Sequence, residues 1–204
     1  MRIITISREF GSGGRELGKR LADHLGIPCY DQQIIEMIAE ESGLDKSYVA
    51  HISEKSIQVA YPMTIGQRFS MPRPANEQQV SVISAQKNLL KKLASETDCV
   101  IVGRAADVIL KEFNPLNIFV YASKEAKIKR CLERASDEEA ISEKEIVKKM
   151  KQIDKNRKEL HDLIASTEWG NKAEYHLCIN TTDVIIKDLI PALASYAQMW
   201  FKNK

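Results

Sequence analysis

The chain has 204 residues, of which 44% are hydrophobic and 28% are charged, and its formal net charge at pH 7 is +2. This length and hydrophobic content are enough for one well-packed core, so we expect a single domain over residues 1–204. A net charge so close to zero excludes the general attraction that draws basic proteins to nucleic acid or to anionic membranes, and we expect neither as a partner.

The first predicted elements are a strand, a glycine-rich turn and a helix. The apolar run at residues 3–6 leads into the turn, and apolar residues then recur at helical spacing from Leu17 to Leu25. Glycines let successive backbone N–H groups turn toward an anion, and the N-terminus of the following helix adds a partial positive charge. The pattern therefore predicts a phosphate-binding loop built from Arg8, Gly11, Ser12, Gly13, Gly14, Arg15 and Glu16.

This turn also has a simpler interpretation, and it lacks one expected residue. Glycine-rich turns occur at ordinary tight bends, in which case Arg15, Glu16, Lys19 and Arg20 form a solvated first helical turn. The Walker A pattern of phosphate-binding loops requires Gly-Lys-Ser/Thr at the end of the turn, whereas this chain has Gly13-Gly14-Arg15-Glu16. The predicted loop is thus without its usual lysine.

Strand-like runs and helical patterns alternate along the rest of the chain, which is typical of an α/β protein. Further strands are predicted at residues 27–30, 99–103, 116–121 and 175–180. Helices are predicted at residues 32–42, 45–59, 76–96, 105–111, 123–135, 142–166 and 183–201. Three prolines and a glycine within residues 61–76 favour a loop there. Five strands separated by helices predict a parallel sheet with helices on both faces.

Polar side chains follow the predicted strands directly. In parallel sheets, ligands lie at the carboxyl ends of the strands, which selects Asp31 after the second strand and Arg104 after the third. A guanidinium at this edge suits bidentate contact with a phosphate or with the edge of a base. The alternative for Arg104 is an ion pair with Asp107, about one helical turn further on.

The cysteines and histidines show no metal-binding spacing. Because the four cysteines, Cys29, Cys99, Cys131 and Cys178, are scattered without a C-x-x-C pair, we expect reduced core residues of a cytoplasmic protein. None of the four histidines is paired with another histidine or cysteine at ligand spacing, so no zinc site is expected. The sequence shows neither a secretory signal nor an apolar run of membrane-spanning length.

Four segments resemble the cytidylate kinase-like branch of the P-loop nucleoside monophosphate kinases. They are residues 6–16, Leu25-Gly26-Ile27-Pro28-Cys29-Tyr30-Asp31, Val102-Gly103-Arg104 and Asp154-Lys155-Asn156-Arg157. The resemblance implies a three-layer P-loop NTPase-like fold with a five-stranded parallel sheet and a helical lid. It also implies an acceptor-binding or insert region at about residues 32–97 and a lid at about residues 124–166. ATP and Mg²⁺ are the implied cofactors.

The resemblance also implies roles for individual residues. Asp31 and Arg104 would hold the acceptor, and Asp107 would stand in for the aspartate of the family's Gly-Arg-Asp step, which reads Gly103-Arg104-Ala105 here. Arg157 would reach the transferring phosphate from the lid. Arg130 and Arg134 are further catalytic candidates in the lid region, although the acidic residues between the lid's basic ones are equally typical of solvated helix faces.

The variant loop can be aligned with the family in two registers. Alignment through residues 25–26 puts Gly14 at the lysine position and Glu16 at the position of the metal-binding hydroxyl. A shift of one residue puts Arg15 at the lysine position instead. Our hypothesis is that Arg15, helped by Arg8 or Lys19, replaces the lysine, and that Mg²⁺ rests on water, phosphate oxygens and a carboxylate.

Three functions remain open from the sequence. The first is a kinase that transfers the γ-phosphate of ATP to a nucleoside monophosphate, with CMP or dCMP preferred. The second is a nucleotide-binding or regulatory protein without transfer activity, and the third is a P-loop kinase of another small metabolite. The sequence does not decide the acceptor, because discrimination depends on pocket geometry. The role of residues 61–76 and the oligomeric state also stay open.

Overall fold

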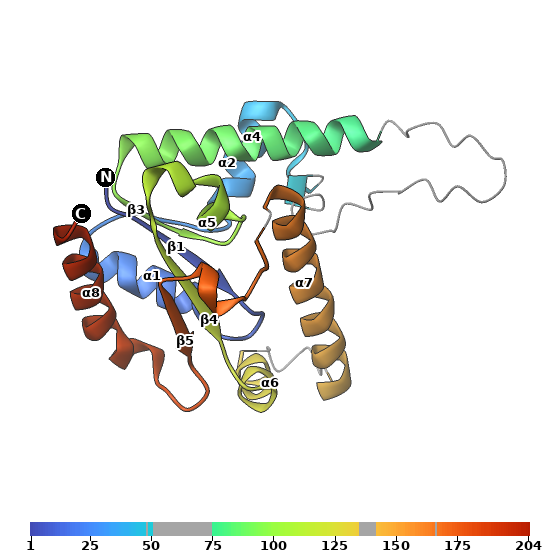
Figure 1. Cartoon of the computed structure of the whole chain (residues 1–204). Coiled ribbons are helices and arrows are strands. Elements are labelled where there is room, and N and C mark those ends of the chain that lie inside the picture. The colour runs from blue at the N-terminus through green and yellow to red at the C-terminus, as the bar shows by residue number, and fades with distance from the viewer. Residues whose placement is uncertain (48, 51–74, 135–141, 166) are drawn as a thin grey trace.

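A five-stranded parallel sheet forms the centre of the molecule (Figure 1). The computed structural model describes residues 1–47, 49–50, 75–134, 142–165 and 167–204. The strands lie in the order β2-β3-β1-β4-β5. Their bounds are β1 Ile3–Arg8, β2 Cys29–Tyr30, β3 Cys99–Val102, β4 Leu116–Tyr121 and β5 Leu177–Asn180. All carboxyl ends therefore meet at one edge.

The central strands are buried on both faces, which explains their unbroken apolar sequences. Ile3, Ile4 and Ile6 of β1 are fully buried. In the register, Ile3 lies beside Cys99 of β3, and Ile6 lies between Val102 of β3 and Ile118 of β4. Alternate residues of β1 and β3 belong to separate apolar cores on opposite faces. The sheet is thus the middle layer of three.

Helices cover both faces of the sheet (Figure 1). One face packs against α1 (Gly14–Leu25) and α8 (Ile186–Lys202), and the other against α2 (Gln33–Ser42), α4 (Ala75–Glu96) and α5 (Ala106–Ile109). Two short 3₁₀ turns, Lys111–Phe113 and Lys172–Glu174, precede β4 and β5. Gly18 lets α1 lie close to the sheet, because a Cβ there would be 2.7 Å from Cγ2 of Val102.

Two helices stand beyond the carboxyl ends of the strands, α6 (Lys124–Leu132) and α7 (Glu143–Ile164). Ser123 caps α6 by accepting from the Ala126 N–H, and α7 begins with a reciprocal capping box between Ser142 and Glu145. Ile128 of α6 and Met150 of α7 share a small apolar cluster with Phe10 of the glycine-rich loop. This packing fixes both helices beside the loop.

The structure confirms the predicted fold class and the five strands, with differences at the ends of elements. β5 begins at Leu177 and α8 at Ile186, two and three residues later than predicted. The helix predicted at residues 105–111 ends as α5 at Ile109, followed by a 3₁₀ turn. Most of the helix predicted at 45–59, and the loop at 61–76 up to residue 74, lie outside the described residues. The assignments of residues 32–97 and 124–166 stay predictions.

One prediction about the cysteines is wrong. All four thiols are free, but Cys99 alone among them is buried, and Cys178 is exposed. Cys178 lies on β5, the edge strand of the described sheet, and its side chain is on the exposed face of that strand. Within the described part of the chain, no helix is long and apolar enough to cross a membrane.

Candidate active site

The glycine-rich loop between β1 and α1 has the backbone of an anion cradle. Gly11 and Gly13 have φ angles of +75° and +81°, in the left-handed region that favours glycine. Gly13 is the N-cap of α1, and with no side chain it leaves the first-turn N–H groups uncapped. These N–H groups and the partial positive charge of the helix end fit the phosphates of a nucleotide.

Contacts from two distant segments hold the loop in this shape. The buried Ser12 donates its hydroxyl to the Glu9 carbonyl at 2.8 Å, and Thr181 Oγ1 donates to the Ser12 carbonyl at 2.7 Å. Arg130 of α6 donates to the carbonyls of Gly11 and Thr181, at 2.8 and 3.0 Å. Arg130 thus links Gly11 of the loop to Thr181, the residue after β5, and its catalytic role stays a prediction.

Arg130→Ala is expected to lower the free energy of unfolding by about 2 kcal/mol, because two carbonyls lose a charged donor. The affinity for ATP should fall as the loop loosens. Urea denaturation and calorimetric titration measure the two effects. The matched control is Lys129→Ala, an exposed neighbour on the same helix, with an expected change within about 0.5 kcal/mol. Equal stability of the two variants would contradict this role of Arg130.

The first turn of α1 does not direct its charged side chains at the loop. Arg15 is 58% exposed, and its Nε lies 2.5 Å from Oδ2 of Asp31, at the end of β2. Glu16 binds Arg20 at 2.8 Å and Arg134 at 2.5 Å. Arg134 is therefore connected to the first turn of α1 by its ion pair with Glu16. Arg15 is directed toward Asp31 at the end of β2. The catalytic roles of Arg15 and Arg134 stay predictions.

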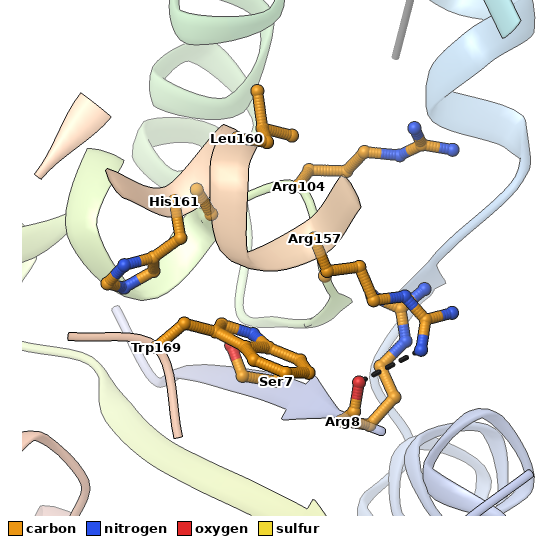
Figure 2. Close-up of a pocket in the computed structure, with 9 residues that line it drawn as sticks. Ser7, Arg8, Arg104, Arg157, Leu160, His161 and Trp169 are labelled. Carbon is orange, nitrogen blue, oxygen red and sulfur yellow. Dashed lines mark hydrogen bonds between the residues drawn. The ribbon is translucent and has the colours of Figure 1, made fainter. Parts of the chain in front are cut away.

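Four arginines lie close together at this edge of the sheet, and we call them the arginine cluster: Arg8, Arg15, Arg104 and Arg157. Three of them line a cavity of about 30 Å³ at the carboxyl edge of the sheet. Figure 2 shows Arg8 and Arg157 together on one side of this cavity, with His161 and Trp169 on the other. Asp31 pairs with Arg8 and Arg15, and Asp154 pairs with Arg157 at 3.3 Å. Four guanidinium groups this close together attract a bound anion.

Arg8 is the most enclosed member of the cluster. Its side chain is 14% exposed, and Nη2 lies 3.8 Å from Oδ1 of Asp31. Burial and the charge of Arg157 lower the pKa of Arg8 to about 9, with smaller contributions from Arg104 and Arg15, while Asp31 acts in the opposite direction. The guanidinium is still a cation at neutral pH, held where a bound anion would stabilise it.

The turn after β3 is strained. Gly103, Arg104 and Ala105 have φ angles of +78°, +63° and +51°, so two residues other than glycine adopt the left-handed region in succession. Gln86 of α4 donates to the Arg104 carbonyl at 3.0 Å and helps to hold this turn. Strain of this kind is concentrated at functional sites. It sets Arg104 on the wall of the cavity, as expected from its position after the strand.

The Asp154-x-x-Arg157 step of α7 contacts the backbone of the loop. Asp154 Oδ1 accepts from the Phe10 N–H at 2.7 Å, and Arg157 Nη1 donates to the Arg8 carbonyl at 3.0 Å. Burial raises the pKa of Asp154, against the opposing effects of the Phe10 N–H and Arg157. The predicted lid residue Arg157 thus extends from α7 to the start of the loop and lines the cavity.

A buried polar pair at the wall of the cavity has no counterpart among the sequence predictions. His161 and Asp107 are both nearly inaccessible, with Nε2 and Oδ2 3.5 Å apart. Burial and the charge of Asp107 raise the pKa of Tyr175. Asp107 therefore lies in the interior beside His161, and its role toward the acceptor stays a prediction. His161 follows Arg157 by four residues, a spacing that puts both on one helix face and was the available signal.

The described residues contain no cluster of three or more His, Cys, Asp or Glu side chains that would hold a metal ion. Glu16, the carboxylate predicted to take part in cofactor binding, is engaged with two arginines, Arg20 and Arg134. A Mg²⁺ ion in this site would therefore be coordinated mainly by water and by phosphate oxygens of the nucleotide, as is common for this ion.

Sheet order, glycine-rich loop and helices beyond the strand ends together define a P-loop kinase fold. The chain belongs to the cytidylate kinase-like family, whose sequence model matches residues 3–183. No curated protein matches the chain in sequence.

Solved structures agree with this fold. An uncharacterized protein from Eubacterium ventriosum ATCC 27560 is 28% identical, with a TM-score of 0.70 and coverage of 97% of this chain and 99% of that one. Shikimate kinase from Acinetobacter baumannii in complex with shikimate is 17% identical, with a TM-score of 0.54 and coverage of 100% and 95%. A gluconokinase from Sinorhizobium meliloti 1021 is 10% identical, with a TM-score of 0.53 and coverage of 99% and 94%.

Proposed function

We propose that this protein transfers the γ-phosphate of ATP to a small anionic acceptor, and that the acceptor is a nucleoside monophosphate, CMP or dCMP. The observation that carries the proposal is the arginine cluster beside the glycine-rich loop. Phosphoryl transfer requires positive charge around two sets of phosphates and little covalent chemistry from the protein. The loop and the cluster supply that charge from five different segments of the chain.

The residues divide between the two substrates by position. The loop with the first turn of α1 faces the phosphates of ATP, and Arg104 and Asp31 at the ends of β3 and β2 face the acceptor. Arg157 lies between the two sides and would stabilise the charge that develops on the transferred group. When bound, Mg²⁺ supplies the charge that bridges the β- and γ-phosphates. The small cavity implies that α7 moves outward to admit a nucleotide.

Asp31 favours a second candidate, a kinase of a hydroxyl-bearing anionic metabolite. A carboxylate at the acceptor side can accept the proton of an attacking hydroxyl, whereas a phosphate acceptor is already an anion and needs no base. The A. baumannii shikimate kinase, with shikimate bound, has the same fold. A cluster of arginines would hold the carboxylate or phosphate of such a metabolite equally well.

A coupled assay of ADP release with Mg²⁺ and ATP distinguishes these functions. The acceptors are CMP, dCMP, UMP and AMP, with shikimate and gluconate as hydroxyl acceptors. We expect acceptor-dependent turnover with CMP or dCMP of about 1–100 s⁻¹, the usual range for kinases. Turnover with a hydroxyl acceptor alone would support the second candidate. Calorimetric binding of ATP without turnover on any acceptor would instead indicate a nucleotide-binding protein that has lost transfer.

A further inference from the structure

The space that a lysine would need at the end of the loop is filled by another residue. In the spacing G-x-x-x-x-G-K, Arg8 takes the position of the first glycine, Gly13 that of the second and Gly14 that of the lysine. A Cβ on Gly14 would lie 2.6 Å from Cβ and 3.0 Å from Cγ of Arg8. Because the backbone of β1 fixes the Arg8 Cβ, it cannot move aside as the end of a side chain can.

The other end of the Arg8 side chain meets a second glycine. A Cβ on Gly103 would lie 1.7 Å from Nη1 of Arg8. The guanidinium therefore lies against the backbone of the turn after β3, and Nη1 of Arg157 donates to the Arg8 carbonyl (Figure 2). Gly14 and Gly103 thus border a slot that runs from the loop to the cavity, and Arg8 fills it.

Arg15 does not occupy this slot. It lies in the first turn of α1, is largely exposed and is bound to Asp31. Arg8, in contrast, is enclosed, and its side chain starts where the side chain of residue 14 would start. The structure therefore favours the register with Gly14 at the lysine position over the shifted one.

We propose that Arg8 is the phosphate-binding cation of this loop, performing from the end of β1 the task that the Walker A lysine performs from the start of the helix. The inference rests on the proposed function, since it assumes a nucleotide in the loop. A Walker A loop has glycine at the position of residue 8 and lysine at the position of residue 14, whereas this chain has Arg8 and Gly14. Both arrangements contain one cation and one glycine at this pair of positions. The guanidinium of Arg8 lies beside Gly103 and lines the cavity at the carboxyl edge of the sheet.

Calorimetric titration with Mg²⁺ and ATP tests this assignment through a reciprocal exchange. Arg8→Met keeps the apolar stem and removes the charge, and should weaken ATP binding roughly 10–100-fold. Gly14→Lys alone should bind no better than Arg8→Met, because the Arg8 stem overlaps the new side chain. The double variant R8G/G14K should bind at least about tenfold more tightly than R8G alone, because the lysine regains its slot.

The controls separate this inference from the proposed function. Arg2→Ala removes an arginine that precedes the opposite end of β1 and is paired with Asp98, and this variant should bind ATP like the wild-type chain. Gly103→Ala displaces the Arg8 guanidinium without changing Arg8, and should also weaken binding; thermal denaturation verifies that each variant is folded. If folded Arg8→Met or Gly103→Ala binds like wild type, Arg8 is not the cation, and the proposed function stands. A wild-type chain that binds no ATP would overturn both.

Discussion

Arg157→Ala is expected to lower the rate of phosphoryl transfer about 10³-fold or more and to change ATP affinity only a few-fold. Arg157 lines the cavity from α7 and donates to the Arg8 carbonyl, so its guanidinium stands between the loop and the acceptor side. A cation in this position stabilises charge that is present mainly in the transition state, and its loss therefore reduces kcat more than binding. Steady-state kinetics combined with calorimetry separates the two quantities.

The matched control for this variant is Lys155→Ala. Lys155 lies on the same helix, is 66% exposed and pairs with Glu159, so its loss should leave kcat unchanged. Arg157→Lys should recover part of the rate, because it restores the charge but not the bidentate geometry. Equal kcat values for Arg157→Ala and the wild-type chain would remove Arg157 from the transfer step.

Asp31→Ala is expected to reduce kcat/KM for the acceptor by at least about 100-fold. The carboxylate is bound to Arg15 at 2.5 Å and lies 3.8 Å from Arg8, so its removal leaves these two cations without the negative charge between them. The melting temperature should fall with it, and added inorganic phosphate should restore part of the loss by supplying the missing negative charge.

Asp31→Asn identifies the chemical role of this carboxylate. If the acceptor is a hydroxyl, the amide cannot accept its proton, and kcat should fall about 10²–10⁴-fold. If the acceptor is a phosphate, no base is required, and kcat should stay within about tenfold of wild type while KM changes through lost charge balance. Asp98→Asn, at the opposite end of the sheet, is the control. Full wild-type kinetics of Asp31→Asn and Asp31→Ala would exclude Asp31 from the acceptor side.

Most of the fold follows from local patterns in the sequence. The strands are short apolar runs buried on both faces, and a parallel sheet is the arrangement that accepts such runs without alternation. The positions of Asp31 and Arg104 follow from the rule that ligands lie at the carboxyl ends of strands, and the structure does bring both residues to the same edge. These predictions need only spacing and residue type.

The sequence alone could not predict the side-chain contacts between distant segments. The Arg15–Asp31 pair depends on how α1 is rotated relative to β2. Arg130 reaches the Gly11 carbonyl of the loop because α6 packs beside Phe10. The left-handed backbone at Arg104 and Ala105 gives no signal in residue type, since neither residue prefers it. Similarly, burial of Asp107 beside His161 depends on the packing of α5 against α7.

The overlap between Arg8 and position 14 also restricts how such a loop can evolve. A chain with large side chains at both positions would have to place two stems in one volume, because the two Cβ atoms would lie 2.6 Å apart. A series of single substitutions that converts a loop with lysine at position 14 into this loop must therefore lose the lysine before it gains the arginine at position 8. The intermediate along that path has glycine at both positions, so descent by single steps passes through a loop without its own cation.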